Sequence, residues 1–567
     1  MSVRRIRAPL LVLVVSALVF GQTAAPATGS TQAPSSPDTI LHGGKVLTMN
    51  ADDPARITVA EAVAIRDGRF VGVGGNAAIR ALAAPDTRII DLEGRTVIPG
   101  IIDTHQHFDF CGGRAPEVVP PAIAISGTNA AEVREAALST IAAEAAARPA
   151  GDWITVSLPR SVLGVDIGVL VRAGLITKDD LDAMAPNHPV MVNHGTNTVV
   201  NSTAIAMVFA ATEESLGIDL ETGHAGLGTR RRITSEVQAG SVALNANRFK
   251  LSLEASAACG QTTISTHLLR GALNPAAIVQ LAQRGEMAIR LAVKDELIYS
   301  FGPTDMVWNT GVGTNTDSSY PGVATTAPAR PEIKAREHEG LPPGSLRRIQ
   351  FETAVRNGQR LAGGHVAGDL TLDHFMDLIE AGSAAAGLTA DEIRARRHAA
   401  DHCTMHPRPD QISRLRELGM ILSCQPKYIR DTAPQIARDY GPEFTKWSAP
   451  VRSLIEGGVR VVYGSDENRA NVVFEDMETL VTRRSQDGRV YNPEERIDRM
   501  TALLMATRWA AGYVLREDVL GSIEVGKWAD LVVLEGDYQT VPDETISEVR
   551  PVMTLVGGRI VYRASGL

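Results

Sequence analysis

The chain has 567 residues, of which 44% are hydrophobic and 21% are charged. This ordinary globular composition excludes wholesale disorder, collagen and a polytopic membrane protein. Asp and Glu number 65 against 56 Lys and Arg, and no basic stripe interleaved with aromatic residues is present, so nucleic acid is excluded as a partner. We expect a small-molecule substrate, and the sequence leaves a homodimer open.

The first 25 residues are typical of a secretory signal peptide. Arg4, Arg5 and Arg7 precede an apolar run of 13 residues, 8–20, and small residues follow at 23–25. The run is too short to cross a bilayer comfortably, although an uncleaved membrane anchor is the alternative. We therefore predict export to the periplasm or the extracellular space, with no membrane span after cleavage. Residues 26–37, rich in Ala, Pro, Ser and Thr, predict a flexible leader.

The chain has four cysteines, Cys111, Cys259, Cys403 and Cys424, and no CxxC pair. Export permits disulfides, but a chain of this size does not need them for stability. We expect free, mostly buried thiols.

Both ends of the mature chain predict β-hairpins. In each, two short apolar runs flank a two-residue turn that can adopt positive φ. The turns are Gly43-Gly44, Asp67-Gly68 and Gly557-Gly558, and residues 529–534 add another apolar strand. Because an isolated hairpin is marginal in water, we predict one small β-sandwich built from residues 38–98 and 516–567.

Residues 99–515 follow a different pattern, in which a helix, a short Gly turn and an apolar strand repeat. Helices are predicted at 130–147, 276–285, 345–359, 409–418 and 451–458, and strands at 287–293, 420–423 and 459–464. Such α/β repeats indicate a parallel sheet. Their number favours a distorted (β/α)₈ TIM barrel with insertions over an open doubly wound sheet, for which no GxGxxG motif is found. Residues 300–343 predict a long loop.

The clearest chemical signal is His105-Gln106-His107, which ends the apolar run 97–102. On a strand, residues i and i+2 face the same side, so both imidazoles can bind one metal ion. Two surface histidines on a loop would give the same local pattern.

Three downstream residues strengthen the metal-site interpretation. His365 and His402 follow predicted strands 37 residues apart, and Asp466 follows a strand 64 residues further on. The C-terminal strand ends of a barrel meet at one mouth, where active sites lie. Four histidines and one aspartate predict a divalent-metal site there, for Zn²⁺ above Fe, Mn or Ni.

Two longer motifs carry a resemblance to a known family. Residues 99–107 (PGIIDTHQH) resemble the opening motif of the amidohydrolase superfamily, and residues 521–534 (GSIEVGKWADLVVL) resemble its C-terminal signature. The stretches around His365, Asp401-His402 and 181–190 are similar to amidohydrolase family 3, the YtcJ-like group. The resemblance implies a TIM barrel carrying a β-sandwich. It also implies His105, His107, His365, His402 and Asp466 as metal ligands, with Asp466 as proton shuttle.

The sequence departs from this family pattern in three places. The fourth-strand lysine that often bridges two metals is missing from residues 307–313, and Lys294, read as a solvated strand-end residue, lies one strand early. One tightly held ion is therefore expected, although two remain open. A DGHSAWVNS-like segment appears with Thr196 in place of its histidine and with His194 two residues earlier. Asp401 stands where the family carries Glu.

For two further residues near the site motifs, a structural role is favoured over a role in metal binding. His267 also ends a predicted strand and could line the site, but a loop or core histidine is favoured. Cys403 follows His402, and strand alternation directs it into packing.

The predicted activity is metal-dependent hydrolysis of a non-peptide C–N bond in an amide, cyclic amide or N-acyl compound. Ester, lactone or carbamate hydrolysis and hydrolytic deamination are alternatives on the same site. A secreted non-catalytic binding barrel is the alternative from a different class. The substrate-binding residues are unknown from sequence.

Overall fold

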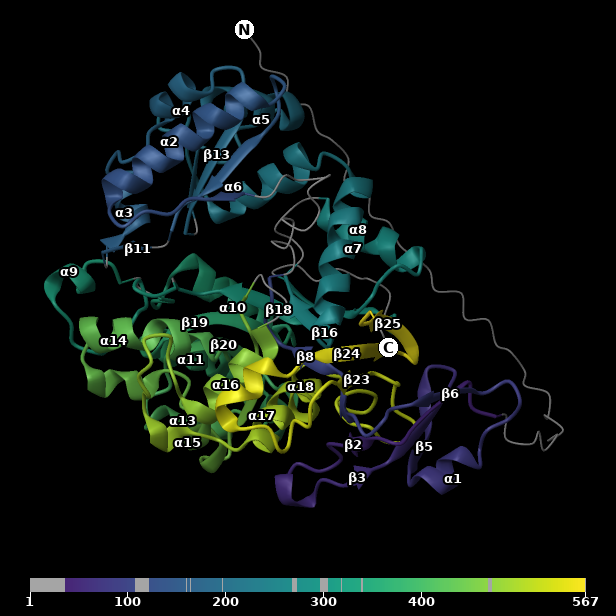
Figure 1. Ribbon diagram of the computed structural model, residues 1–567. Helices are drawn as coiled ribbons and strands as arrows, with labels where there is room; N and C mark the ends of the chain where they lie inside the picture. The colour runs from purple at the N-terminus through teal and green to yellow at the C-terminus, as the bar shows by residue number, and fades with distance from the viewer. Residues whose placement is uncertain are drawn as a thin grey trace, which may run out of the picture. The chain divides into compact units, whose positions relative to one another are not determined.

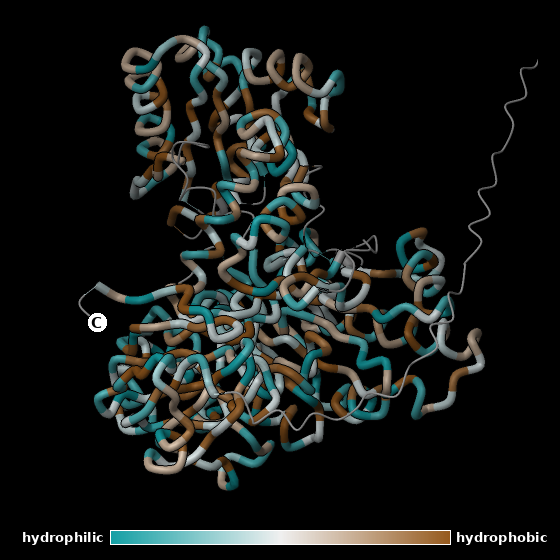
Figure 2. Tube along the Cα trace, turned by 90° about the vertical axis from the view of Figure 1, so that its right-hand side faces the viewer, coloured by the Kyte–Doolittle hydropathy of each residue, from teal (hydrophilic) through white to brown (hydrophobic). Residues whose placement is uncertain are grey.

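The computed structural model describes residues 36–107, 122–159, 161–163, 165–195, 197–267, 273–295, 304–317, 319–337, 340–467 and 472–565. The predicted signal peptide and most of the leader, and Cys111 and Thr196, lie outside these residues. Apolar residues occur along the described chain in short stretches (Figure 2). Within the described part of the chain, no helix combines the length and the apolar character needed to cross a membrane.

Strands from both ends of the chain form two sheets, seen in purple and yellow in Figure 1. The first sheet has the order β5-β4-β1-β6, and the second has the order β25-β24-β23-β7-β2-β3. Buried Leu41, Val63 and Phe70 of the first sheet and Val97, Leu531 and Leu555 of the second share one apolar core. The strands are Thr39–His42 (β1), Lys45–Leu47 (β2), Val59–Ala60 (β3), Ala62–Arg66 (β4), Arg69–Gly74 (β5), Arg88–Asp91 (β6), Thr96–Pro99 (β7), Leu531–Leu534 (β23), Pro551–Val556 (β24) and Arg559–Arg563 (β25).

Two of the three predicted hairpins form. Strands β4 and β5 pair across Asp67-Gly68, and β24 and β25 pair across Gly557-Gly558. The prediction for Gly43-Gly44 is wrong, because β1 and β2 belong to different sheets. There the glycine turn carries the chain from one layer of the sandwich to the other, and each strand pairs with a partner distant in sequence.

Eight parallel strands form the barrel, in the order β8-β16-β17-β18-β19-β20-β21-β22. A backbone hydrogen bond from Thr104 N to Tyr463 O, 3.1 Å, links the ends of the first and last strands. The predicted fold class, a TIM barrel inserted into a β-sandwich made by both chain ends, is confirmed. The strands are Ile101–Asp103 (β8), Gln261–Thr266 (β16), Arg290–Asp295 (β17), Val307–Asn315 (β18), Leu361–Gly368 (β19), Ala399–Met405 (β20), Ile421–Cys424 (β21) and Arg460–Tyr463 (β22).

The predicted loop at 300–343 is partly wrong, since β18 occupies residues 307–315 within it. Apolar periodicity is weak there because Gly311 and Gly313 interrupt the strand. Four helices that follow barrel strands agree with the predictions within a few residues, namely Asn274–Gln283 (α8), Leu346–Arg356 (α10), Gln411–Glu417 (α13) and Val451–Glu456 (α15). The helices Asp369–Ala385 (α11) and Arg508–Tyr513 (α18) were not predicted.

Between β8 and β16 the chain forms an additional α/β lobe that the sequence indicated only as an insertion. Its five-stranded sheet has the order β15-β14-β13-β10-β9 and buries a core of its own around Val156, Leu181 and Val192. The helix Val242–Ala258 (α7) then returns the chain to the barrel, where it packs on α8 and β16. The lobe contains Ile123–Ala124 (β9), Ala130–Ala147 (α2), Ile154–Ser157 (β10), Ile167–Arg172 (α3), Lys178–Met184 (α4), Val190–His194 (β13), Asn197–Val200 (β14), Ser202–Thr212 (α5), His224–Gly226 (β15) and Leu227–Arg232 (α6).

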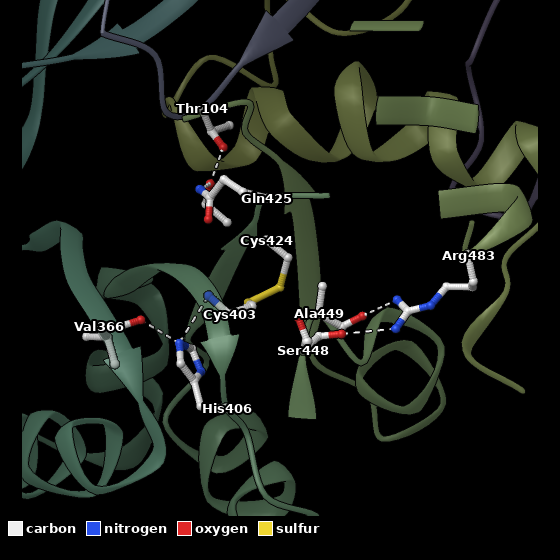
Figure 3. The surroundings of a disulfide bond; sticks show 10 residues. Thr104, Val366, Cys403, His406, Cys424, Gln425, Ser448, Ala449 and Arg483 are labelled. Carbon is white, nitrogen blue, oxygen red and sulfur yellow. Dashed lines mark hydrogen bonds between the residues drawn. A yellow bond between two sulfur atoms is a disulfide. The ribbon is translucent and has the colours of Figure 1, made fainter. Parts of the chain in front are cut away.

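A disulfide joins Cys403 of β20 to Cys424 of the adjacent strand β21 (Figure 3). The expectation of free thiols is therefore wrong for this pair, which parallel pairing of the strands places side by side.

Candidate metal centre

The structure brings the five sequence-predicted ligands to one end of the barrel. His105 and His107 follow β8, His365 lies in β19, His402 lies in β20 and Asp466 follows β22. The imidazole ring of His105 lies 5.0 Å from that of His107 and 4.7 Å from that of His402, between centroids. The rings of His365 and His402 are 4.0 Å apart.

Buried hydrogen-bond acceptors fix the orientation of three imidazoles. His105 Nδ1 donates to Asp401 Oδ2 at 2.6 Å, and His365 Nδ1 donates to Asp317 Oδ1 at 2.9 Å. His402 Nδ1 donates to the hydroxyl of Tyr428 at 3.0 Å. These bonds leave the Nε2 lone pairs of His105 and His402 free to face a cation, as in the carboxylate–histidine pairs common at metal sites. His365 Nε2 lies 3.2 Å from the Ser319 hydroxyl.

The donor set fits a divalent cation. His105 Nε2 and His402 Nε2 are buried and have no hydrogen-bond partner among the described residues. Donor atoms of His105, His402 and Asp466 all lie within 4.8 Å of one another. Burial lowers the pKa of His105 far below its usual value and that of His402 to about 4, so both rings are neutral, as metal binding requires.

Asp466 has contacts on both carboxylate oxygens. Oδ1 lies 2.9 Å from His107 Nε2, while Oδ2 accepts from the Tyr428 hydroxyl at 2.8 Å and lies 2.7 Å from Lys427 Nζ. Burial alone would raise the pKa of Asp466, but the charge of Lys427 and the hydrogen bonds from the histidines hold it far below the usual value. The carboxylate is therefore ionised at neutral pH.

The four imidazoles differ in their exposure to solvent. The side chains of His105 and His402 are 4% and 2% exposed, whereas those of His107 and His365 are 19% and 22% exposed. His107 and His365 therefore form the more exposed side of the cluster. On this side Arg231, from α6 of the inserted lobe, brings a guanidinium nitrogen to 3.4 Å from His107 Nδ1.

The description of Lys294 as a solvated residue is wrong. Its side chain is fully buried, and Nζ lies 2.5 Å from Asp401 Oδ2, 2.8 Å from Thr104 O and 3.1 Å from the Tyr513 hydroxyl. Gly363 makes room for the stem, because a Cβ there would lie 2.3 Å from Lys294 Cδ. The lysine thus supports His105 through Asp401, and its Nζ also lies 3.2 Å from His105 Nδ1.

Several residues around the ligands were not found by sequence reasoning. Asp317 falls in the region predicted as a loop, and no local motif distinguishes Tyr428 or Lys427. Arg231 belongs to a run of three arginines, 230–232, which could have attracted notice in an acidic chain. His194, singled out in the sequence, lies on β13 of the inserted lobe, where it stacks edge-on with His224 at 6.1 Å.

Comparison with known proteins agrees with this architecture. The family model described as "Amidohydrolase family" matches residues 88–562. The chain is 25% identical over 563 residues to an N-substituted formamide deformylase of Arthrobacter pascens, covering 90% of this chain and 96% of that protein. It is 23% identical over 576 residues to YtcJ of Bacillus subtilis, covering 93% and 99%. A crystal structure described as an uncharacterized metal-dependent hydrolase from Pyrococcus furiosus superposes with a TM-score of 0.65 at 20% identity, covering 88% of this chain and 100% of that one.

The fold and the match define a class of protein, a TIM-barrel hydrolase. The chain belongs to the amidohydrolase family. It is an enzyme, a hydrolase of carbon–nitrogen bonds other than peptide bonds.

Proposed function

We propose that this enzyme hydrolyses an amide, cyclic amide or N-acyl C–N bond of a small molecule, with the cluster of His105, His107, His365, His402 and Asp466 holding the cation that activates water. The observation that carries the proposal is the pair of buried, unpartnered nitrogens His105 Nε2 and His402 Nε2 beside the Asp466 carboxylate. An unpartnered buried polar atom is costly in a folded protein, and a bound cation removes that cost for both rings at once.

Imidazole and carboxylate ligands suit Zn²⁺ best among common divalent ions. When bound, such a cation acts as a Lewis acid that polarises a carbonyl group and lowers the pKa of nearby water to about 7. The histidines would hold the cation. Asp401 and Asp317 orient the imidazoles of His105 and His365 through hydrogen bonds to their Nδ1 atoms.

Asp466 moves the proton in the proposed reaction. Its carboxylate is ionised at neutral pH, because Lys427 and the Tyr428 hydroxyl stabilise the charge. It can therefore take a proton from the attacking water as a general base. The protonated carboxyl then delivers that proton to the departing nitrogen as the C–N bond breaks, which makes it the general acid of the second step.

The substrate class rests on similarity. The relative from Arthrobacter pascens is named for action on N-substituted formamides, in which a small acyl group is bonded to nitrogen. A carbonyl of that size can approach from the side lined by His107 and His365. We include N-acyl compounds, cyclic amides and carbamates in the first substrate screen.

We also propose export from the cytoplasm. The Cys403–Cys424 disulfide supports this localisation, because structural disulfides persist mainly in oxidising compartments. N-terminal sequencing of the exported protein is expected to begin between about residues 25 and 35, after the small residues that suit a signal peptidase. A chain that still begins at Met1 would contradict the proposal.

The decisive test is Asp466→Asn in metal-replete enzyme, with Asp179→Asn on the exposed surface of α4 as the control. We expect kcat to fall by about 10²–10⁴-fold while bound metal is largely retained, because the histidines still bind it. The control should match the wild type. A kcat within a few-fold of the wild type would remove Asp466 from the mechanism. Wild-type protein that holds no metal after gentle purification would favour a binding barrel.

A further inference from the structure

His267 lies in the barrel mouth beside the predicted ligands. It follows β16, the second barrel strand, and its side chain is almost fully buried. The backbone bond from Gln106 N to Ser265 O, 3.1 Å, fixes the register of β8 against β16. That bond pairs Gln106 with Thr266, so His267 lies level with His107 and, by strand alternation, on the same face. Its ring is 6.2 Å from that of His105, edge to face.

The neighbouring wall of the barrel is shaped to accept this ring. A Cβ on Gly313 of β18 would lie 2.4 Å from His267 Cε1 and 2.8 Å from its Nδ1. Real Cβ atoms essentially never come this close to other heavy atoms, so any side chain at position 313 would displace the imidazole. The ring of His267 thus reaches across β17 and occupies the space that a side chain at position 313 of β18 would need.

We infer that His267 is a further imidazole ligand of the cation site, supplied by β16 on the side where β18 has Gly313. The inference rests on the proposed metal site and adds a donor to it. Three observations support it, namely the shared level with His107, the ring distance to His105 and the glycine that makes room. A histidine that only filled the core would need none of this proximity to other imidazoles.

The test compares His267→Gln and His267→Ala with His188→Gln, all as full-length holoenzyme. His188 is a matched control, because it is a buried histidine of the inserted lobe whose Nδ1 lies 3.1 Å from Asp152 O. Zinc affinity is measured by competition with a chromophoric chelator, and the number of imidazoles per zinc by X-ray absorption. Loss of a residue that only hydrogen-bonds to a metal ligand already lowers metal affinity by about 10–100-fold. Both His267 variants should therefore lose at least about tenfold in zinc affinity. Their imidazole count should fall, and the control should keep both values.

Unchanged zinc affinity and imidazole count in His267→Gln would overturn the inference, and a loss of activity alone would then make His267 a substrate contact. Should the variants not fold, anomalous diffraction from zinc-loaded wild-type crystals decides. A zinc peak about 2.0–2.1 Å from a His267 nitrogen supports ligation, and a peak beyond about 3 Å excludes it. Wild-type enzyme that binds no zinc would instead refute the proposed function itself.

Discussion

Replacement of Lys294 by methionine tests whether the buried lysine supports the metal ligands. Lys294 and Asp401 are both fully buried, with 2.5 Å between Nζ and Oδ2. Methionine keeps most of the stem that packs against Gly363 but removes the charge, so Asp401 would remain as an uncompensated buried carboxylate. Loss of one member of a buried ion pair costs about 3–5 kcal/mol. We expect Lys294→Met to lower the free energy of unfolding of the barrel by that amount.

The assay is urea unfolding of metal-free protein, followed by tryptophan fluorescence and circular dichroism. Because Asp401 also accepts from the Tyr513 hydroxyl at 2.8 Å, Asp401→Asn should be tolerated better in the Lys294→Met background than alone. A double-mutant cycle measures this coupling. Lys178→Met is the control, because it removes a surface ion pair in which Lys178 Nζ lies 3.8 Å from Asp182 Oδ2. It should change the free energy of unfolding by no more than about 1 kcal/mol. An equally small effect for Lys294→Met would refute the reasoning, since it would mean that other groups satisfy Asp401.

Three further outcomes follow from the same geometry. His105→Ala should lose the metal and nearly all activity while the circular dichroism spectrum is kept, because the barrel core does not depend on one ligand; retained metal stoichiometry would contradict this. His398 and His406 are buried with pKa values lowered by desolvation to about 3 and about 4. As the pH falls below about 6.5, the unfolded chain binds protons at these histidines before the folded protein does. The free energy of unfolding should therefore be greatest above about pH 6.5 and should decrease towards pH 3–4. An acid titration in which it does not change would contradict this. Cys403→Ser should cost about 3 kcal/mol, because the disulfide to Cys424 closes a loop of 21 residues, and thermal unfolding with and without reductant measures the loss.

The sequence predicted those parts of the fold that depend on local patterns. Apolar runs ending in glycine turns located most barrel strands, and the helix at 130–147 has the predicted bounds. Strand β18 was missed because it contains Gly311 and Gly313 and too few apolar residues in alternation. The sheet change at Gly43-Gly44 was missed because a turn signal does not say which partner each strand will take.

The clustering of the five candidate ligands could be predicted, and their surroundings could not. Strand ends of a barrel converge at one mouth, so a histidine or aspartate after each apolar run suffices to predict the cluster. The partners that orient the imidazoles come from other elements, at sequence distances that no motif spans. Asp401 is 296 residues from His105, and Asp317 is 48 residues from His365. Burial of Lys294 likewise depends on the absence of a side chain at Gly363, which only the packed structure reveals.

Two of the candidate donor residues, His402 and Asp466, have positive φ angles. His402 and Cys403 have φ values of 98° and 48°, and Asp466 has 51°, where residues other than glycine cost about 1–3 kcal/mol each. Such conformations persist only when surrounding contacts outweigh them. At Cys403 the stabilising contacts are the disulfide to Cys424 and a hydrogen bond from the backbone N to His406 Nε2 at 3.1 Å (Figure 3). His406 Nε2 also lies 2.6 Å from Val366 O. The hydroxyl of Tyr428 forms hydrogen bonds with both His402 Nδ1 and Asp466 Oδ2. The disulfide and Tyr428 therefore fix the directions of two donors before any ligand binds, which is the preorganisation that a cation site needs.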